Sequence, residues 1–160
     1  MPQSFEQTLI LLKPDAVQRR LVGRILARFE QKGLSIVALK MMQVSEELAR
    51  RHYAVHEGKE FYEPLVEFIT ASPIIACVLE GVDAIATARK LMGATFGRDA
   101  APGTIRGDFG ISKRYNLIHG SDSPKSAQFE IALYFGPGEI LDFKPDDLPW
   151  VYDLNGPEPV

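Results

Sequence analysis

One short stretch of the chain combines a histidine with residues that would hold it in place for chemistry. Residues Asn116–Ser123 read NLIHGSDS, and Glu130 follows them by seven positions. The pattern predicts a buried strand that ends just before His119, a sharp turn at Gly120, and a helix that begins after capping serine and aspartate residues. A carboxylate on that helix would fix the tautomer and orientation of the His119 ring, as a histidine nucleophile requires.

The same histidine also has a simpler interpretation. A lone histidine after two apolar residues is more often a hydrogen-bonded structural residue than a catalyst, so the local pattern leaves both roles open. Other chemistries have less support. Gly58-Lys59 lacks the upstream glycine of a P-loop, the three histidines and one cysteine lack zinc-ligand spacing, and no serine sits in a nucleophile elbow. Phosphoryl transfer through His119 remains, and it requires cations around the phosphates and a surface for the base.

Three cations in distant segments are candidates for the phosphate-binding role. Lys13 follows an apolar strand, Arg89 lies on a predicted helix, and Arg106 lies in a glycine-rich segment. Each of them alone is more often a solvated or structural charge. They would act together only in a fold that brings the strand end, the helix and the loop to one place, which the sequence leaves open.

The elements that must position these residues follow from hydrophobic periodicity. Apolar runs predict strands at 8–12, 34–44 and 74–79. Helical stripes with capping residues, Asp83 among them, predict helices at 22–32, 46–53, 61–69, 84–92 and 124–135. Residues 94–110 are rich in glycine and have little periodicity, which predicts a long functional loop. The order of elements contains two β-α-β units and predicts an α+β ferredoxin-like sandwich, a four-stranded antiparallel sheet with helices on one face.

The chain divides into two parts at residue 136. Residues 1–136 are predicted to form one domain. Residues 137–160 carry five prolines, which disfavour regular structure, together with apolar residues that include Phe143, Trp150 and Tyr152. This composition predicts an extended C-terminal tail that packs on its own domain or on a neighbouring subunit.

Composition and charge narrow the classes of function. The 160 residues are 46% hydrophobic and 24% charged, which is ordinary for a globular protein. A net charge of −3 without a basic run gives no support for nucleic acid as the main partner. The sequence starts without a secretory pattern and contains no apolar run of membrane-span length, so we expect a cytoplasmic protein with no membrane partner. Cys77 is the single cysteine, which precludes a disulfide within the chain.

The pattern Asn-x-x-His-Gly-Ser-Asp-Ser resembles the active-site signature of nucleoside diphosphate kinases. The resemblance extends over about residues 5–152 and includes Lys13-Pro14-Asp15, His52-Tyr53 and the segment PGTIRGDF at 102–109. It implies transfer of the γ-phosphate of a nucleoside triphosphate to a nucleoside diphosphate, by a ping-pong mechanism through a phosphohistidine intermediate. It also implies Mg²⁺ carried with the nucleotide, with no metal ligands from the protein, and a homohexamer or alternatively a homotetramer.

The resemblance assigns catalytic roles to matching residues. His119 is the nucleophile that takes the γ-phosphate, Glu130 orients its ring, and Ser121 supports Glu130. Tyr53 lies beside the reacting phosphate. Lys13 and Asn116 complete the catalytic group, through contacts to the sugar hydroxyls and the phosphate.

The resemblance also assigns a nucleotide-binding group. In addition to Lys13 and Asn116, this group contains Arg89, Thr95 and Arg106 at the distal phosphates and Phe61 and Leu65 beside the base. Lys113 departs from the family pattern, because family members often have an aliphatic residue opposite Phe61. The stem of a lysine is long enough to cover a ring in that position.

Two rival interpretations belong to other classes. A ferredoxin-like module that binds nucleotides or nucleic acid without turnover is disfavoured by the acidic charge and by the intact His119–Glu130 pair. A histidine phosphatase would need further arginine and histidine motifs that the sequence lacks. Covalent labelling by γ-labelled ATP separates the kinase from the binding module.

Overall fold

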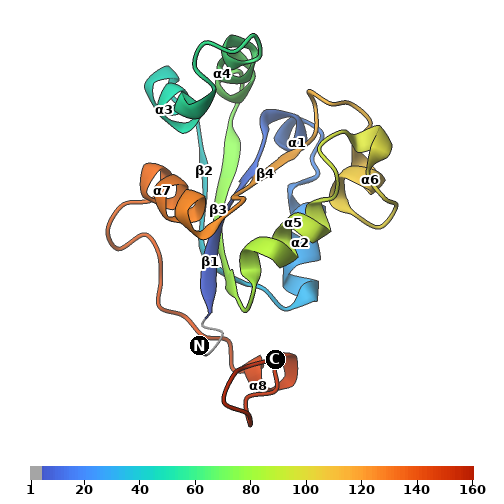
Figure 1. The fold of residues 1–160 in the computed structure, drawn as a ribbon, viewed down its shortest axis with the longest axis vertical. Coiled ribbons are helices and arrows are strands. Elements are labelled where there is room, and N and C mark those ends of the chain that lie inside the picture. Colours follow the sequence, from blue (N-terminus) through green and yellow to red (C-terminus); the bar gives the residue numbers. More distant parts are fainter. Residues whose placement is uncertain (1–4) are drawn as a thin grey trace.

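The computed structural model describes residues 5–160 and is built on a four-stranded antiparallel sheet. The strands are β1 (Glu6–Leu12), β2 (Ser35–Met42), β3 (Ile74–Gly81) and β4 (Ile118–Gly120). Their order in the sheet is β2-β3-β1-β4, and every neighbouring pair is antiparallel. This sheet confirms the predicted ferredoxin-like architecture (Figure 1).

Helices cover both faces of the sheet, so the prediction of helices on one face is wrong. One face is covered mainly by α2 (Val22–Lys32) and α5 (Ala84–Met92). The other face is covered by α3 (Glu46–His52), α4 (Tyr62–Thr70) and α7 (Pro124–Tyr134). Figure 1 shows α7 on one side of the sheet and α2 with α5 on the opposite side.

The pattern of β1 explains the cover on both faces. Successive side chains of a strand point to opposite faces. Leu9 and Leu11 belong to the core under α3, α4 and α7, whereas Ile10 and Leu12 belong to the core under α2 and α5. All four side chains are 0% exposed. A strand that is apolar at every position requires packing on both faces, and the continuous run at 8–12 already carried that information.

Capping residues begin and end the main helices largely as the sequence predicts. The Ser45 hydroxyl accepts a hydrogen bond from the Leu48 amide at the start of α3, and Gly33, with φ of +100°, ends α2. Asp83 precedes α5 as predicted, but its side chain makes no capping hydrogen bond and its backbone is left-handed, with φ of +51°. Asp83 therefore contributes a backbone turn in place of a side-chain cap.

The glycine-rich segment 94–110 contains two short helices, so the prediction of a continuous loop is wrong. They are η2 (Gly97–Asp99) and α6 (Ile105–Phe109), and the Thr104 hydroxyl caps α6 by accepting from the Gly107 amide. Elements of three to five residues are too short to show a hydrophobic period. For the same reason α1 (Pro14–Gln18) and η1 (Ala54–His56) were not predicted.

The C-terminal tail is extended except for one helical turn, α8 (Leu148–Val151). Pro149 lies in the first turn of this helix, where the missing amide proton has no consequence, so proline does not exclude helix there. The tail contacts its own chain: the Leu141 amide donates to the Val37 carbonyl at 3.0 Å, and the Tyr152 hydroxyl accepts from the Val82 amide at 3.3 Å. Figure 1 shows α8 at the end of the molecule opposite α3 and α4. Within residues 5–160, no helix has the length and hydropathy needed to cross a membrane.

Candidate active site

The central pair of the site is His119 on β4 and Glu130 on α7. His119 Nε2 lies 2.8 Å from Oε1 and 3.1 Å from Oε2 of Glu130. Because a carboxylate only accepts hydrogen bonds, Nε2 carries the ring proton and Nδ1 keeps its lone pair. Among the described residues no group bonds to Nδ1, and the side chain is 24% exposed. The arrangement therefore presents an unprotonated imidazole nitrogen to a substrate.

Ser121 ties the Glu130 carboxylate to the central strand. Its hydroxyl donates to Glu130 Oε1 at 2.9 Å and accepts from the Leu9 amide of β1 at 3.3 Å. Ser121 is fully buried and Glu130 nearly so. A buried carboxylate with two donors on one oxygen has little freedom to rotate, and this rigidity is passed to the His119 ring.

The backbone bend that aims His119 lies at Leu117, so the predicted turn at Gly120 is wrong. Leu117 has φ of +73°, a conformation that is strained for a leucine. Its amide donates to Asp15 Oδ2 at 3.1 Å and its carbonyl accepts from the Lys13 amide at 2.8 Å, which hold the bend. Gly120 instead continues β4 opposite Ile10, where a Cβ would lie 2.6 Å from the sulfur of Met92.

Lys13, Asn116 and Thr95 form a chain of hydrogen bonds beside the histidine strand. Lys13 Nζ donates to Asn116 Oδ1 at 2.8 Å, and Asn116 Nδ2 donates to the Thr95 carbonyl at 3.0 Å. Burial lowers the pKa of Lys13 to about 8, and the nearby Arg106 charge acts in the same direction. The fold thus brings together three predicted residues from separate segments.

Arg106 and Arg89 hold the backbone on either side of His119. Arg106 donates from Nη2 to the Ile118 carbonyl at 2.6 Å, and from Nε and Nη1 to two further carbonyls at 3.1 and 3.0 Å. Arg89 Nη1 donates to the Gly120 carbonyl at 3.0 Å. Burial lowers the pKa of Arg106 to about 10, with a smaller contribution from the Arg89 charge. Three of the five N–H groups of Arg106 are used in this way, which leaves two for a ligand.

His52, a residue with no predicted role, lies between Tyr53 and the central pair. The buried ring of His52 stacks on Tyr53 with centroids 4.6 Å apart and meets His119 edge-on at 4.7 Å. Burial raises the pKa of Tyr53, and the Glu130 charge adds to that shift, so Tyr53 keeps its hydroxyl proton. In the sequence, His52 stands out only as the neighbour of Tyr53.

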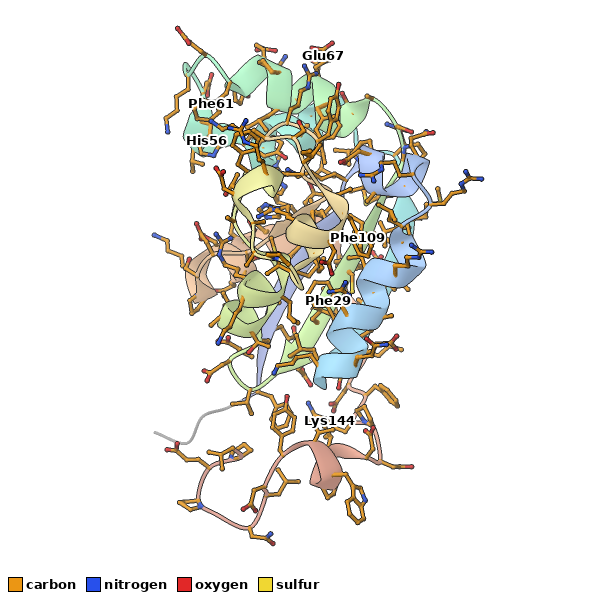
Figure 2. The ribbon with its side chains drawn as sticks, turned by 90° about the vertical axis from the view of Figure 1, so that its right-hand side faces the viewer. Phe29, His56, Phe61, Glu67, Phe109 and Lys144 are labelled. Carbon is orange, nitrogen blue, oxygen red and sulfur yellow. The ribbon has the colours of Figure 1, made fainter. Side chains whose placement is uncertain are left out.

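The two residues predicted to flank the base lie at the α3–α4 end of the molecule. Phe61 is 48% exposed, and its ring lies 5.1 Å from that of His56. Figure 2 shows these two side chains close together at that end. Leu65 packs at the margin of the core one helical turn further along α4. Lys113 is exposed on the segment between α6 and β4.

Within residues 5–160, one group of side chains has ligand atoms close enough to share a metal ion. The group comprises His52, His119 and Glu130, whose nitrogen and oxygen atoms lie within 4.8 Å of one another. The hydrogen bonds from His119 and Ser121 to Glu130, and the packing of the His52 ring against Tyr53 and His119, account for this clustering. Two imidazoles are also poor partners for Mg²⁺, which prefers oxygen ligands.

The sequence profile of the family described as nucleoside diphosphate kinase matches residues 6–140, a range that contains every site residue described above. The chain belongs to the nucleoside diphosphate kinase family. Nucleoside diphosphate kinases of Microcystis aeruginosa and Synechococcus elongatus are 55% and 56% identical to it over 149 residues, which cover 93% of this chain and 100% of each relative. The solved structure of a halophilic nucleoside diphosphate kinase from Halobacterium salinarum, in complex with CDP, has a TM-score of 0.91 at 51% identity and covers 93% of this chain and 99% of its own.

Membership in the nucleoside diphosphate kinase family confirms the predicted activity and fold class. The chain is a phosphotransferase that acts on nucleotides, transferring the γ-phosphate of a nucleoside triphosphate to a nucleoside diphosphate. The binding module without turnover and the histidine phosphatase are therefore discarded.

Proposed function

We propose that Nδ1 of His119 is the atom that carries the phosphoryl group between the two nucleotides. Nδ1 attacks the γ-phosphorus of the triphosphate, the new N–P bond forms as the bond to the bridging oxygen breaks, and the diphosphate leaves. A second nucleoside diphosphate then takes the group by the reverse step. The observation that carries this proposal is the 2.8 Å contact between His119 Nε2 and Glu130, which leaves the Nδ1 lone pair available.

Glu130 has an electrostatic role as well as an orienting one in this proposal. Positive charge develops on the imidazole as the N–P bond forms, and a buried carboxylate against Nε2–H stabilises that charge. Lys13, Arg89 and Arg106 supply positive charge to the phosphates, because phosphoryl transfer spreads negative charge over the phosphate oxygens. The remaining assignments are Asn116 with Lys13 at the sugar hydroxyls and the phosphate, Tyr53 beside the reacting phosphate, Thr95 at the distal phosphates, and Phe61 with Leu65 beside the base.

Mg²⁺ enters this proposal as part of the nucleotide. Three of the side chains proposed to contact the phosphates, Lys13, Arg89 and Arg106, are cationic, and the nearby Glu130 carboxylate is already engaged with His119 and Ser121. This set of side chains fits an ion that is held by phosphate oxygens and water. When bound, the ion neutralises charge on the distal phosphates.

A labelling experiment tests the ping-pong proposal. Enzyme mixed with γ-labelled ATP and Mg²⁺ is expected to acquire a covalent label that is stable in base and labile in acid, as phosphohistidine is. Subsequent addition of GDP or CDP is expected to remove the label and give the corresponding triphosphate. Rapid transfer between nucleotides without any labelled protein would indicate direct transfer in a ternary complex and would contradict the proposal.

The lowered pKa of Lys13 predicts a loss of activity at alkaline pH. In the free enzyme Lys13 loses its charge as pH rises through about 8, so kcat/KM for the triphosphate is expected to fall above that pH. Lys13→Arg stays charged and should lack this alkaline limb, even at a lower overall rate. The free energy of unfolding changes in the opposite direction, because the folded state favours neutral Lys13. The stabilising contribution of neutral Lys13 is complete above its ordinary pKa of 10.5 and is lost as pH falls through about 8. An identical limb in the Lys13→Arg variant would contradict this assignment.

Stacking on Phe61 predicts an enzyme that is nearly indifferent to the base. Every nucleobase has a π-face, and stacking on an aromatic ring stabilises each by about 1–3 kcal/mol. Purine and pyrimidine diphosphates are therefore expected to have kcat/KM values within about two decades of one another, with purines ahead because of their larger area. Phe61→Ala should weaken all of them together. A preference of many thousandfold in kcat/KM for one base would refute the stacking account. A new base preference of that size in the Lys113→Val variant would refute it as well.

We also propose a domain of residues 1–136, a tail of residues 137–160, and a homohexamer, with the homotetramer as the alternative. Support comes from apolar side chains left exposed on this chain, which include Leu39 and Met41 of edge strand β2 and Phe143 and Trp150 of the tail. Trp150 is 92% exposed, which is unusual for a residue with so much apolar area. The cytoplasm remains the proposed compartment, since Cys77 is a buried free thiol that suits reducing conditions.

Deleting residues 138–160 is expected to lower the melting temperature by several degrees. The deletion removes the Leu141–Val37 hydrogen bond, the Lys144–Glu80 ion pair and the packing of Tyr152 against Phe5. Burial of one aromatic side chain contributes about 1.5–3 kcal/mol. Trp150→Ser separates assembly from folding, because Trp150 is 92% exposed within the single chain. Unchanged melting of the truncated protein, together with unchanged mass in light scattering, would show that the tail is passive.

A further inference from the structure

A second histidine lies directly behind the reacting pair. His52, at the end of α3, has a side chain that is 3% exposed. Its Nδ1 lies 2.7 Å from the Tyr134 hydroxyl, and its Nε2 lies 3.8 Å from Glu130 Oε2. Neither His52 nor Tyr134 has a role in the proposed reaction.

The polarity of the His52–Tyr134 hydrogen bond follows from its surroundings. Burial lowers the pKa of His52 to about 2, so the ring is neutral, and burial raises the pKa of Tyr134, so its hydroxyl keeps the proton. If Nδ1–H donated to Tyr134, the Nε2 lone pair would face the Glu130 carboxylate and be repelled. If Tyr134 donates to Nδ1, Nε2 carries a proton that faces Glu130 Oε2. The second arrangement is therefore the stable one.

The two carboxylate oxygens of Glu130 accept different sets of hydrogen bonds. Oε1 receives the Ser121 hydroxyl at 2.9 Å and His119 Nε2 at 2.8 Å. Oε2 receives only the longer 3.1 Å contact from His119, and it faces His52. At 3.8 Å the His52 N–H is too far for a hydrogen bond, but its dipole still attracts a buried carboxylate strongly because little water screens it.

The geometry points to His52 and Tyr134 as positioning residues: the Tyr134 hydroxyl fixes the His52 tautomer, and His52 fixes the second oxygen of Glu130. Tyr134 lies one helical turn after Glu130 on α7, so both project toward α3 from the same face. The pair thereby restrains the carboxylate that orients His119. This inference rests on His119 being the phosphoryl acceptor.

Four variants separate this role from simple packing. Tyr134→Phe removes only the hydroxyl. His52→Phe keeps an aromatic ring against Tyr53 but has no N–H, whereas His52→Gln keeps an amide N–H near the Nε2 position. Tyr62→Phe is the matched control, because Tyr62 is a buried tyrosine of the same core cluster whose hydroxyl interacts with Arg50 and not with Glu130 or His119.

The rate of phosphoenzyme formation is measured in single turnovers with γ-labelled ATP and Mg²⁺, and ADP affinity is measured separately by calorimetry. His52→Phe is expected to slow phosphorylation by about 10- to 100-fold and Tyr134→Phe by about 3- to 10-fold, as for the loss of a polar partner of a charged group. ADP affinity should stay within about twofold, His52→Gln should recover most of the rate, and Tyr62→Phe should match the parent enzyme. Nitrogen-15 spectra should show His52 Nδ1 unprotonated in the parent enzyme.

Several results would overturn the inference. If Tyr134→Phe and His52→Phe both form phosphoenzyme at the parent rate, the two residues only pack in the core, even if the variants melt at lower temperatures. Equal losses of rate and ADP affinity would place the pair in nucleotide binding. A protonated His52 Nδ1 in the spectra would show that His52 donates to Tyr134, which contradicts the inference. Because the spectra are recorded on the parent enzyme, this test does not depend on the folding of His52→Phe. Failure of the parent enzyme to take label on His119 would instead refute the proposed function.

Discussion

A His119→Ala variant is expected to lose nucleotide-to-nucleotide transfer by at least about 10⁴-fold, the order of loss when a covalent nucleophile is removed. The remaining side chains offer no replacement at the same point, since His52 is buried behind Glu130 and engaged with Tyr134. Binding of nucleoside diphosphate should persist within a few-fold, because the proposed phosphate and base contacts come from other segments. Steady-state kinetics and calorimetry measure the two quantities separately.

His56→Ala is the control for this variant. His56 lies beside Phe61 and is partly exposed, so its loss removes a histidine near the nucleotide without touching the reacting pair. It should take label to the same final stoichiometry as the parent enzyme. Retention of label in His119→Ala, or its loss in His56→Ala, would move the phosphoryl acceptor away from His119.

Glu130→Gln is expected to lower kcat by about 10²- to 10⁴-fold, the range for loss of a carboxylate that orients a catalytic histidine. Glutamine nearly matches the shape of glutamate and can still accept the Ser121 hydroxyl bond, so the fold should be kept. The negative charge against His119 Nε2–H is lost, however, and the ring is free to adopt the other tautomer. Nδ1 would then be protonated for part of the time and unable to attack.

Nucleotide affinity and melting temperature serve as controls for Glu130→Gln. Glu139→Gln is the matched substitution, since Glu139 is an exposed carboxylate that pairs with Lys40 far from the site. It should leave kcat unchanged. A Glu130→Gln enzyme with parent kcat would show that transfer does not depend on the carboxylate charge at the 2.8 Å contact with His119.

The sequence was sufficient for the long elements and for their order. The main strands and five helices have stripes or runs long enough to be recognised, and caps such as Ser45 and Gly33 are local. Helices of five residues or fewer were missed because they bury too few side chains to create a pattern, as α6 shows with Ile105 and Arg106. The placement of helices on both faces was readable from β1, whose every position from Leu9 to Leu12 is apolar.

The residues of the candidate site also fall into two groups, those recognisable from the local sequence and those that only the fold brings together. His119, Ser121 and Glu130 are close in sequence and were found from local pattern, with the family resemblance supplying their roles. The strained Leu117 and its partner Asp15 could not be predicted, because a leucine gives no indication of a left-handed backbone and the two residues are joined only by the fold. The His52–Tyr134 contact likewise joins two helices that are distant along the chain.

The position of the phosphoryl group on the His119 ring tests the central claim most directly. Phosphoenzyme made with ATP and Mg²⁺ can be hydrolysed in base, where phosphohistidine survives, and the product compared with authentic Nδ1- and Nε2-phosphohistidine. Because Glu130 holds Nε2–H at 2.8 Å, we expect the Nδ1 isomer at close to one equivalent per chain. The Nε2 isomer, or phosphate on any other residue, would contradict the account.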